Sequence, residues 1–275
     1  VMTMKKPGLL ARSLRDLLYK EARIRTVAGV CIGSTYIAVR LDDDGLGLAA
    51  VPVAALSGPE QEMSFPPEAS LRGRPAAFLL DWLTQSDHPR QKALALATAN
   101  ALIRQDHSDF DGDALDAFHL TADDRVVMVG RFTPLMARIT ATGAALTVLE
   151  KNPAKGMVLP AEERRRVLER GTVAIITATA MLYDDLEEIL SDLVRPRHVS
   201  LLGPSTPMLP EIFALTPVTH LGGVKITDTD RVMSIVAAGG GTRTMRLGLE
   251  MTNMVLKRGG QGDEMHEPSP PLVRV

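Results

Sequence analysis

The chain has 275 residues, 45% of them hydrophobic and 23% charged, which is the composition of a globular protein with a substantial core. Its formal net charge of −2 gives no basic field for nucleic acid, and no apolar run approaches the roughly 20 residues of a membrane span. The single cysteine, Cys31, excludes an internal disulfide and a zinc site built from cysteines. We therefore expect a cytoplasmic protein with neither a nucleic-acid nor a membrane partner.

The first part of the chain, residues 1–118, predicts an α+β domain. Leucines between Leu9 and Leu18 recur at helical spacing with charged residues between them, which indicates an amphipathic helix. Three segments rich in Val, Ile and Leu predict short strands: 24–30, 35–41 and 46–53. The sequence Asp-Asp-Asp-Gly at 42–45 predicts a hairpin turn with its glycine at positive φ.

Two further helices and a linker complete this part. Helical periodicity runs over 76–84 and 89–105. Asn100 lies on or beside the apolar face of the second helix. Because a buried amide needs hydrogen-bond partners, Asn100 either binds other parts of the protein or contacts a ligand. The aspartate-rich segment 106–116 does not complete a calcium loop, because Leu120 stands where the closing glutamate would fall. We predict a charged interdomain linker instead.

Beyond the linker, residues 119–258 predict a doubly wound parallel sheet. Four short runs rich in Val, Leu and Ile predict strands: 125–129, 146–149, 173–176 and 199–202. Helical segments at 134–140 and 186–194 alternate with them, which is typical of βαβ units with right-handed crossovers. The rest of the chain predicts edge strands at 220–226 and 232–236, a helix in the 250s and a disordered tail at 259–275.

The first strand-to-helix turn of this sheet, Gly130-Arg-Phe-Thr-Pro134, differs from a dinucleotide-binding turn. It lacks the second and third glycines of G-x-G-x-x-G, which let a pyrophosphate approach the helix. Glu150 ends the next strand, where an acidic side chain usually binds ribose hydroxyls. A nucleoside-type or polyhydroxyl ligand fits this pattern better than a dinucleotide, and a surface glutamate is the alternative.

A turn of small hydroxyl residues, Gly203-Pro-Ser-Thr-Pro207, follows the strand at 199–202. Ligands bind at the carboxyl edge of open α/β sheets, and an ordinary turn with a helix cap is the alternative. Ser205 stands in G-P-S-T-P rather than G-x-S-x-G, so no nucleophile elbow is indicated. In the first part, the connection Gly33-Ser-Thr-Tyr36 could face a ligand, with packing as the alternative for Tyr36.

Several stretches together resemble the putative heavy-metal chelation family. The resemblance covers most of the chain, and its most specific part is Gly203-Pro-Ser-Thr-Pro-Met-Leu-Pro210, followed by Gly222-Gly-Val224 and Asp228. The shorter matches are 33–39, 45–49, Asn100, 130–134, 150–153 and 177–179. The resemblance implies an enolase-N-terminal-like domain over 1–118, a Rossmann-like domain over 119–258 and a ligand cleft between them. It also implies a role in making or handling pterin-, flavin- or siderophore-like metal chelators.

The expected cleft draws ligand-binding residues from both domains: Gly33, Thr35, Tyr36, Asn100, Gly130, Glu150, Thr177, Gly203, Pro204, Ser205, Thr206 and Asp228. Glu150 and Ser205 are the catalytic candidates. We expect Glu150 to orient a hydroxylated ligand or act as acid or base, and Ser205 with Thr206 to hold an anionic or carbonyl oxygen.

The favoured reaction is condensation or hydrolysis on a small heteroaromatic or catecholate molecule. One rival hypothesis is a non-catalytic binding protein for a metal chelate. Another is a methyltransferase that depends on S-adenosylmethionine. The sequence identifies no metal and no cofactor, and it is compatible with a homodimer.

Overall fold

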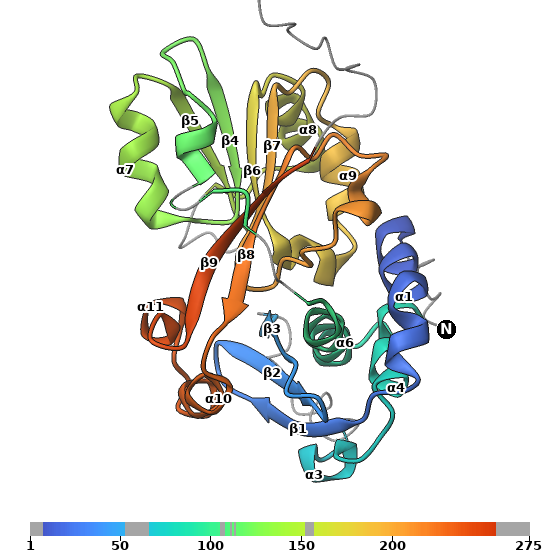
Figure 1. The fold of residues 1–275 in the computed structure, drawn as a ribbon. Coiled ribbons are helices and arrows are strands. Elements are labelled where there is room, and N and C mark those ends of the chain that lie inside the picture. Colours follow the sequence, from blue (N-terminus) through green and yellow to red (C-terminus); the bar gives the residue numbers. More distant parts are fainter. Residues whose placement is uncertain are drawn as a thin grey trace, which may run out of the picture.

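The computed structural model describes residues 8–52, 66–104, 108–110, 112, 114–151 and 157–256, which build two β-sheets (Figure 1). A three-stranded antiparallel sheet has the order β1-β2-β3, and a six-stranded sheet has the order β5-β4-β6-β7-β8-β9. This mixed α/β architecture, with a mostly parallel larger sheet, confirms the fold class expected from the sequence. Within the described ranges, no helix has both the length and the apolar character needed to cross a membrane.

The small sheet consists of β1 (Val27–Ile32), β2 (Tyr36–Leu41) and β3 (Leu46–Ala50), and a tight turn joins the last two strands as predicted. The positive φ of this turn, 64°, falls on Asp44 rather than on Gly45. Gly45 is needed for a different reason, because a Cβ there would lie 2.5 Å from the carbonyl oxygen of Ala101. The glycine of the hairpin therefore allows the turn to pack against a helix.

That helix, α6 (Pro89–Leu102), is buried on almost every side. It lies against the small sheet and against helices α1 (Leu9–Ala22), α4 (Ala76–Leu80) and α5 (Trp82–Gln85), while the short α3 (Glu68–Leu71) packs on β1. Another neighbour is η3 (Ala178–Tyr183), which follows a strand of the larger sheet. Because α6 has no broad solvent face, Lys92 and Asn100 must find partners inside the protein.

The larger sheet has five parallel strands and an antiparallel edge strand among the described residues. In chain order they are β4 (Arg125–Val129), β5 (Ala145–Leu149), β6 (Val173–Thr177), β7 (His198–Leu202), β8 (His220–Ile226) and β9 (Leu249–Val255). One face packs on α7 (Thr133–Ala141) and η2 (Ala114–Ala117), and the other on α8 (Ala161–Glu169) and α9 (Leu186–Ser191). The strand order changes direction between β4 and β6, where many open α/β sheets bind ligands.

Two elements predicted near the end of the chain are wrong in type. The segment 232–236, an expected strand, belongs to α10 (Thr229–Ala237), where Val232 and Val236 are buried at the spacing of one helical face. The 250s, an expected helix, form β9, because all seven residues of that segment pair with β8. The predicted tail, 259–275, lies outside the described residues.

The small sheet is covered on both faces. Helix α6 packs on one face, and α10 with α11 (Thr242–Met245) packs on the other, at the lower left of the view (Figure 1). Tyr36 and Leu48 share a buried cluster with Val232, Val236 and Met245. Helices from the second part of the chain thus complete the core around the first sheet.

The described part of the predicted linker is fastened to the edge strand β9. The backbone N–H of Asp109 donates to the carbonyl oxygen of Asn253 at 2.8 Å, and Asn253 Nδ2 donates to the carbonyl oxygen of Phe110 at 3.2 Å. Behind this contact, His220 bonds Asn253 Oδ1 through Nε2 at 3.1 Å and Ser200 Oγ through Nδ1 at 2.7 Å. These buried hydrogen bonds hold β7, β8 and β9 to the linker.

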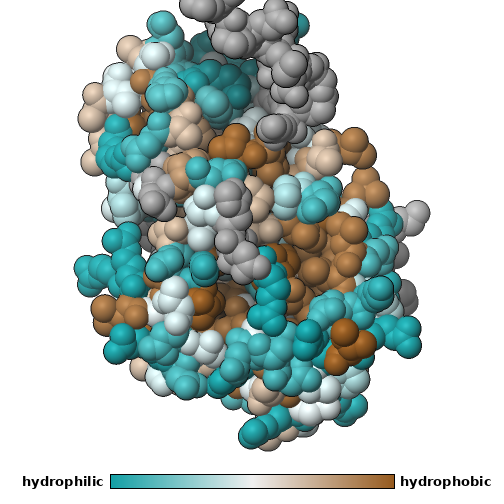
Figure 2. All heavy atoms as spheres, in the orientation of Figure 1, coloured by the Kyte–Doolittle hydropathy of each residue, from teal (hydrophilic) through white to brown (hydrophobic). Residues whose placement is uncertain are grey.

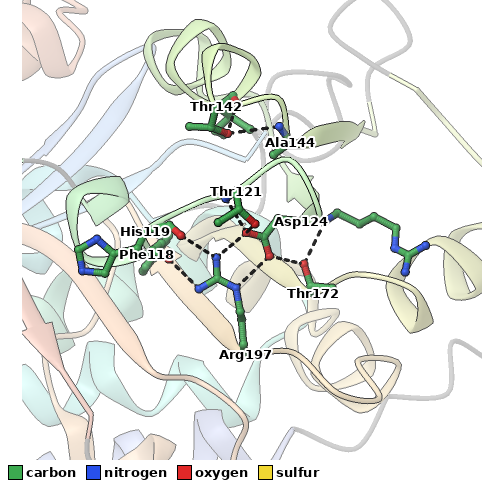
Figure 3. Close-up of polar contacts among 10 residues, drawn as sticks. Phe118, His119, Thr121, Asp124, Thr142, Ala144, Thr172 and Arg197 are labelled. Atoms are coloured by element: carbon green, nitrogen blue, oxygen red, sulfur yellow. Dashed lines mark hydrogen bonds and ion pairs between the residues drawn. The ribbon is translucent and has the colours of Figure 1, made fainter.

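An ion pair closes the amino edge of the parallel strands, as Figure 3 shows. Arg197 donates from Nε to Asp124 Oδ1 at 2.9 Å and from Nη2 to Asp124 Oδ2 at 2.6 Å. Thr172 and Thr121 donate to the same carboxylate, and Arg197 Nη1 donates to the carbonyl oxygen of Phe118 at 2.7 Å. Hydrogen bonds from Arg197 hold the pKa of Asp124 well below its usual value, and the same contact raises the pKa of Arg197.

Candidate functional site

The opposite, carboxyl edge of the larger sheet meets the first part of the chain at Asn100. Asn100 Nδ2 donates to the carbonyl oxygen of Leu48 in β3 at 2.8 Å and to that of Ser205, beyond β7, at 3.2 Å. The backbone N–H of Ala50 donates to Ser205 Oγ at 2.8 Å. These bonds join α6, β3 and the loop 203–208, so the loop and the small sheet keep a fixed spacing.

Glycines allow this close approach. A Cβ on Gly47 would lie 2.0 Å from the carbonyl oxygen of Ala97, so only glycine lets β3 lie directly on α6. A Cβ on Gly223 would lie 2.6 Å from Met208 Sδ. The carbonyl oxygen of Gly222 accepts from the Gly203 N–H and from Thr206 Oγ1, both at 2.9 Å. Main-chain and side-chain contacts of the loop 203–208 therefore hold it against β8.

A small pocket lies between these elements. Its lining is mostly apolar: Leu46, Gly47, Leu48, Asn100, Ile103, Pro204, Thr206, Met208, Val224 and Ile226. Its cavity volume is about 30 Å³, enough for about two water molecules, so only the tip of a larger ligand fits without movement. In the space-filling view, hydrophobic side chains gather at mid-height of the face, beside α6, and hydrophilic side chains cover its lower end (Figure 2).

The structure places three of the expected ligand-binding residues, Asn100, Pro204 and Thr206, in the lining of this pocket. Gly203 and Ser205 lie beside it in the same loop. Ser205 is 2% exposed, and its Oγ accepts the Ala50 N–H. The buried Ser205 hydroxyl joins the loop 203–208 to β3, and it does not face the pocket as a nucleophile would.

The expected contacts from the first hairpin lie elsewhere. Thr35 Oγ1 donates to the carbonyl oxygen of Gly239 at 3.1 Å, and Tyr36 Oη lies 2.8 Å from Thr242 Oγ1. Gly33 packs so tightly that a Cβ would lie 2.2 Å from the carbonyl oxygen of Val236. Burial raises the pKa of Tyr36. These residues join the small sheet to α10 and α11, so packing, the alternative weighed for Tyr36, is what the structure shows.

The remaining candidates lie at the other end of the carboxyl edge, around β4, β5 and β6. A Cβ on Gly130 would lie 2.6 Å from Thr177 Cγ2, so the ends of β4 and β6 approach closely where the strand order reverses. Glu150 Oε1 accepts the backbone N–H of Arg131 at 2.7 Å, which ties the carboxylate to the first turn. Three strand spacings separate β5 from β7, which is roughly 14 Å. Glu150 and Ser205 therefore do not form one catalytic pair.

Asp228 also has a local role in the structure. Its Oδ1 accepts the backbone N–H of Arg231 at 3.0 Å, which caps the first turn of α10. It does not line the pocket.

Sequence reasoning missed one charged contact near this edge. Lys92 of α6 is 7% exposed and pairs with Asp184, whose φ of 53° places it in the left-handed region just after η3. A single lysine within an Ala- and Leu-rich helix was the available signal, because a buried ammonium requires a partner. The apolar lining residues Met208, Val224 and Ile226 gave no comparable signal, since their sequence pattern is that of core residues.

No cluster of three or more His, Cys, Asp or Glu side chains suited to a metal ion occurs in the part of the chain that the structure describes. The donors that line the pocket are an amide and a hydroxyl, which are weak ligands for a transition metal.

Two family models, both described as putative heavy-metal chelation, match the chain over residues 15–103 and 113–255. An uncharacterized protein of Methanocaldococcus jannaschii is 28% identical over 151 residues, which are 52% of this chain. The match spans 58% of the length of that relative.

Two solved structures have the same fold. A protein of unknown function from Desulfitobacterium hafniense has a TM-score of 0.70 at 20% identity, over 89% of this chain and 98% of that one. A protein of unknown function from Pyrococcus horikoshii has a TM-score of 0.75 at 18% identity, over 90% of this chain and 100% of that one. At these identities the likeness concerns the fold alone.

Proposed function

Because the family model over residues 113–255 by itself covers more than half of the chain, the chain belongs to the putative heavy-metal chelation family, and from this premise we propose that it binds a small organic metal chelator. The ligand enters the pocket between the small sheet and the loop 203–208. The proposed function is binding of the chelator without a chemical reaction, and it takes the place of the condensation or hydrolysis favoured from the sequence.

The observation that carries the proposal is that both parts of the chain build the pocket. Leu46, Leu48 and Asn100 come from the first part, and Met208 and Val224 come from the second. Ligand sites commonly occur at such junctions between domains, with apolar walls and a few polar groups that fix orientation. An apolar wall beside one amide suits the ring of an organic chelator better than it suits a bare ion.

Two features favour binding over catalysis. Ser205 Oγ accepts the Ala50 N–H in a buried position, and Glu150 lies three strands away from it.

Titration calorimetry with catechol, pterin and their iron(III) complexes tests the proposal. Val224→Phe places a ring in the pocket without touching the bonds of Asn100, so it should weaken binding at least tenfold. Lys225→Ala changes the exposed neighbour on the same strand and serves as the control.

Chromatography of the reaction mixtures distinguishes the two classes of function. Unchanged ligand supports a binding protein. A product whose formation depends on an open pocket would replace the proposal with an enzyme, and binding that Val224→Phe does not weaken would remove the pocket from the site.

A further inference from the structure

The orientation of the Asn100 side chain is fixed by its two donated hydrogen bonds. Nδ2 faces the carbonyl oxygens of Leu48 and Ser205, at 2.8 and 3.2 Å. A flipped amide would place Oδ1 against these two acceptors, so the assignment of the two atoms is determined by the network. Asn100 therefore presents its carbonyl oxygen, Oδ1, as the remaining polar atom.

That oxygen is buried and accepts no hydrogen bond from any residue that the structure describes. A buried acceptor without a partner destabilises the protein, and such atoms are uncommon in folded proteins. Asn100 is also the lining residue at the junction of α6, β3 and the loop 203–208. The unpaired acceptor thus belongs to a residue that lines the proposed pocket, and the oxygen itself is covered by protein atoms.

The other groups around the pocket do not favour an anion. The ten lining residues include no charged side chain, and the Thr206 hydroxyl donates to the carbonyl oxygen of Gly222. The Ser205 hydroxyl accepts the Ala50 N–H. A carboxylate or phosphate would lose its hydration and face the Asn100 oxygen, which is a second acceptor. This differs from the sequence expectation that Ser205 and Thr206 hold an anionic or carbonyl oxygen.

We propose that the ligand presents an uncharged hydrogen-bond donor, a ring N–H or a phenolic O–H, to Asn100 Oδ1, and that the pocket rejects an anionic end. This inference rests on the proposed function and specifies the chemical class of the ligand. Because Oδ1 is buried, a donor reaches it when a lining side chain moves, and Met208 is the flexible member of the lining. A site built around a hydrogen bond discriminates strongly against analogues that cannot form it.

Three probes of similar size test the inference: phenol, its methyl ether anisole, and benzoate. Phenol offers a neutral donor, anisole offers none, and benzoate offers an anion. Nuclear magnetic resonance titration follows the side-chain amide of Asn100 and the methyl group of Met208, which Met208→Leu assigns. We expect phenol to shift both signals and to bind at least tenfold more tightly than anisole or benzoate.

Variants separate the hydrogen bond from the shape of the pocket. Asn100→Leu removes the acceptor, so phenol and anisole should bind within twofold of each other. Val224→Phe leaves the bonds of Asn100 intact and should abolish the shifts of all probes, which keeps the test valid if Asn100→Leu fails to fold. Lys225→Ala, the exposed neighbour, should bind as the unchanged chain does.

The outcomes distinguish the two proposals. Anisole or benzoate that binds as well as phenol, with shifts at Met208, would overturn the donor inference and leave the binding function standing. If no probe shifts Asn100 or Met208 and the chelators of the calorimetry also fail to bind, both proposals fall. A crystal structure with the phenol hydroxyl away from Asn100 would likewise overturn the inference.

Discussion

The polar contacts at the two edges of the larger sheet join different parts of the molecule. At the amino edge, Asp124 and Arg197 pair with each other and with groups next to β4, β6 and β7, so the contacts fasten strands of one sheet together. At the carboxyl edge, Lys92 and Asn100 of α6 pair with groups beyond β6 and β7, so the contacts fasten the sheet to the first part of the chain. Asn100 Oδ1 stays unpaired among the described residues.

The two edges thus contrast a complete polar network with one that leaves an acceptor unpaired. The amino edge is satisfied within the protein, which is what stability requires. The carboxyl edge is the conventional location of ligands in open α/β sheets, and it carries the unpaired acceptor. Substitutions at the amino edge should therefore change stability alone, whereas the carboxyl edge combines contacts that stabilise the protein with the proposed binding site.

The largest expected effect comes from Lys92→Met at the carboxyl edge. The change leaves Asp184, whose side chain is 13% exposed, without its ammonium partner. We expect a loss of about 3 kcal/mol in the free energy of unfolding, measured with urea. The double variant Lys92→Met/Asp184→Asn should recover part of the loss, because it removes the lone charge. A double variant as unstable as the single one would show that Lys92 acts through packing alone.

The next effect is at the amino edge. Arg197→Ala should cost about 2 kcal/mol, less than a fully buried pair, because Arg197 is 37% exposed and Thr172 still donates to Asp124. The control is Arg138→Ala, which removes an exposed pair with Asp116 and should change stability by about 0.5 kcal/mol or less. Equal losses of stability from both variants would mean that the ion pair at the amino edge stabilises the protein no more than an exposed ion pair does.

Acid should weaken the amino edge in a definite range. The folded-state pKa of Asp124 is depressed by Arg197, so its contribution is complete above the unfolded pKa of 3.8 and is lost as pH falls through the folded pKa. The stability difference between the unchanged chain and Asp124→Asn should be constant from about pH 5 to 8 and shrink below about pH 4. A difference that already shrinks near neutral pH would assign the effect to another group.

Ser205→Ala should have a smaller effect. It removes the acceptor of the Ala50 N–H and leaves a donor without its partner, at a cost of about 1 kcal/mol. Thermal unfolding measures this cost, and Ser205→Thr, which keeps a hydroxyl, is the matched comparison. If the alanine variant is as stable as the unchanged chain, the hydrogen bond between Ser205 and β3 does not stabilise the protein, and Ser205 has another role.

The smallest effect is expected at Glu150, in the exposed turn around β5. Glu150→Gln keeps an acceptor for the Arg131 N–H and removes only the charge, so the free energy of unfolding should change by about 0.5 kcal/mol or less. Chelator binding measured by calorimetry should stay within twofold. A tenfold loss of binding would place Glu150 in the site and reopen the catalytic hypothesis.

Local patterns predicted the parts of the fold that depend on neighbouring residues. The strands β4 to β7 and the helices α1 and α6 follow from short apolar runs and helical spacing. The pattern failed at 232–236, where Val-Met-Ser-Ile-Val suits a strand as well as a helix, and the Asp228 cap with burial of one face favoured the helix. It failed again at β9, where pairing with β8 overrides local preference.

The candidate site was predictable in its polar members and in Pro204 of the same loop as Thr206. Asn100 was a predicted ligand-binding residue because an amide on a buried helix face needs partners, and Thr206 was one because it follows a strand end. Glu150 and Ser205 have equally suggestive positions in sequence, yet two strands, β4 and β6, lie between β5 and β7, and sequence spacing does not reveal strand order. Met208 and Val224 resemble core residues until the loop 203–208 is seated on β8.

By itself, the sequence determined the class of the fold, the elements of the parallel sheet and the residues whose polar groups demanded partners, because periodicity and burial act over a few residues. Tertiary structure alone decided which partners those groups found. Asn100 donates to two carbonyl oxygens and keeps its own oxygen unpaired because α6, β3 and the loop 203–208 meet there, and that meeting depends on contacts between residues 52 and 105 positions apart.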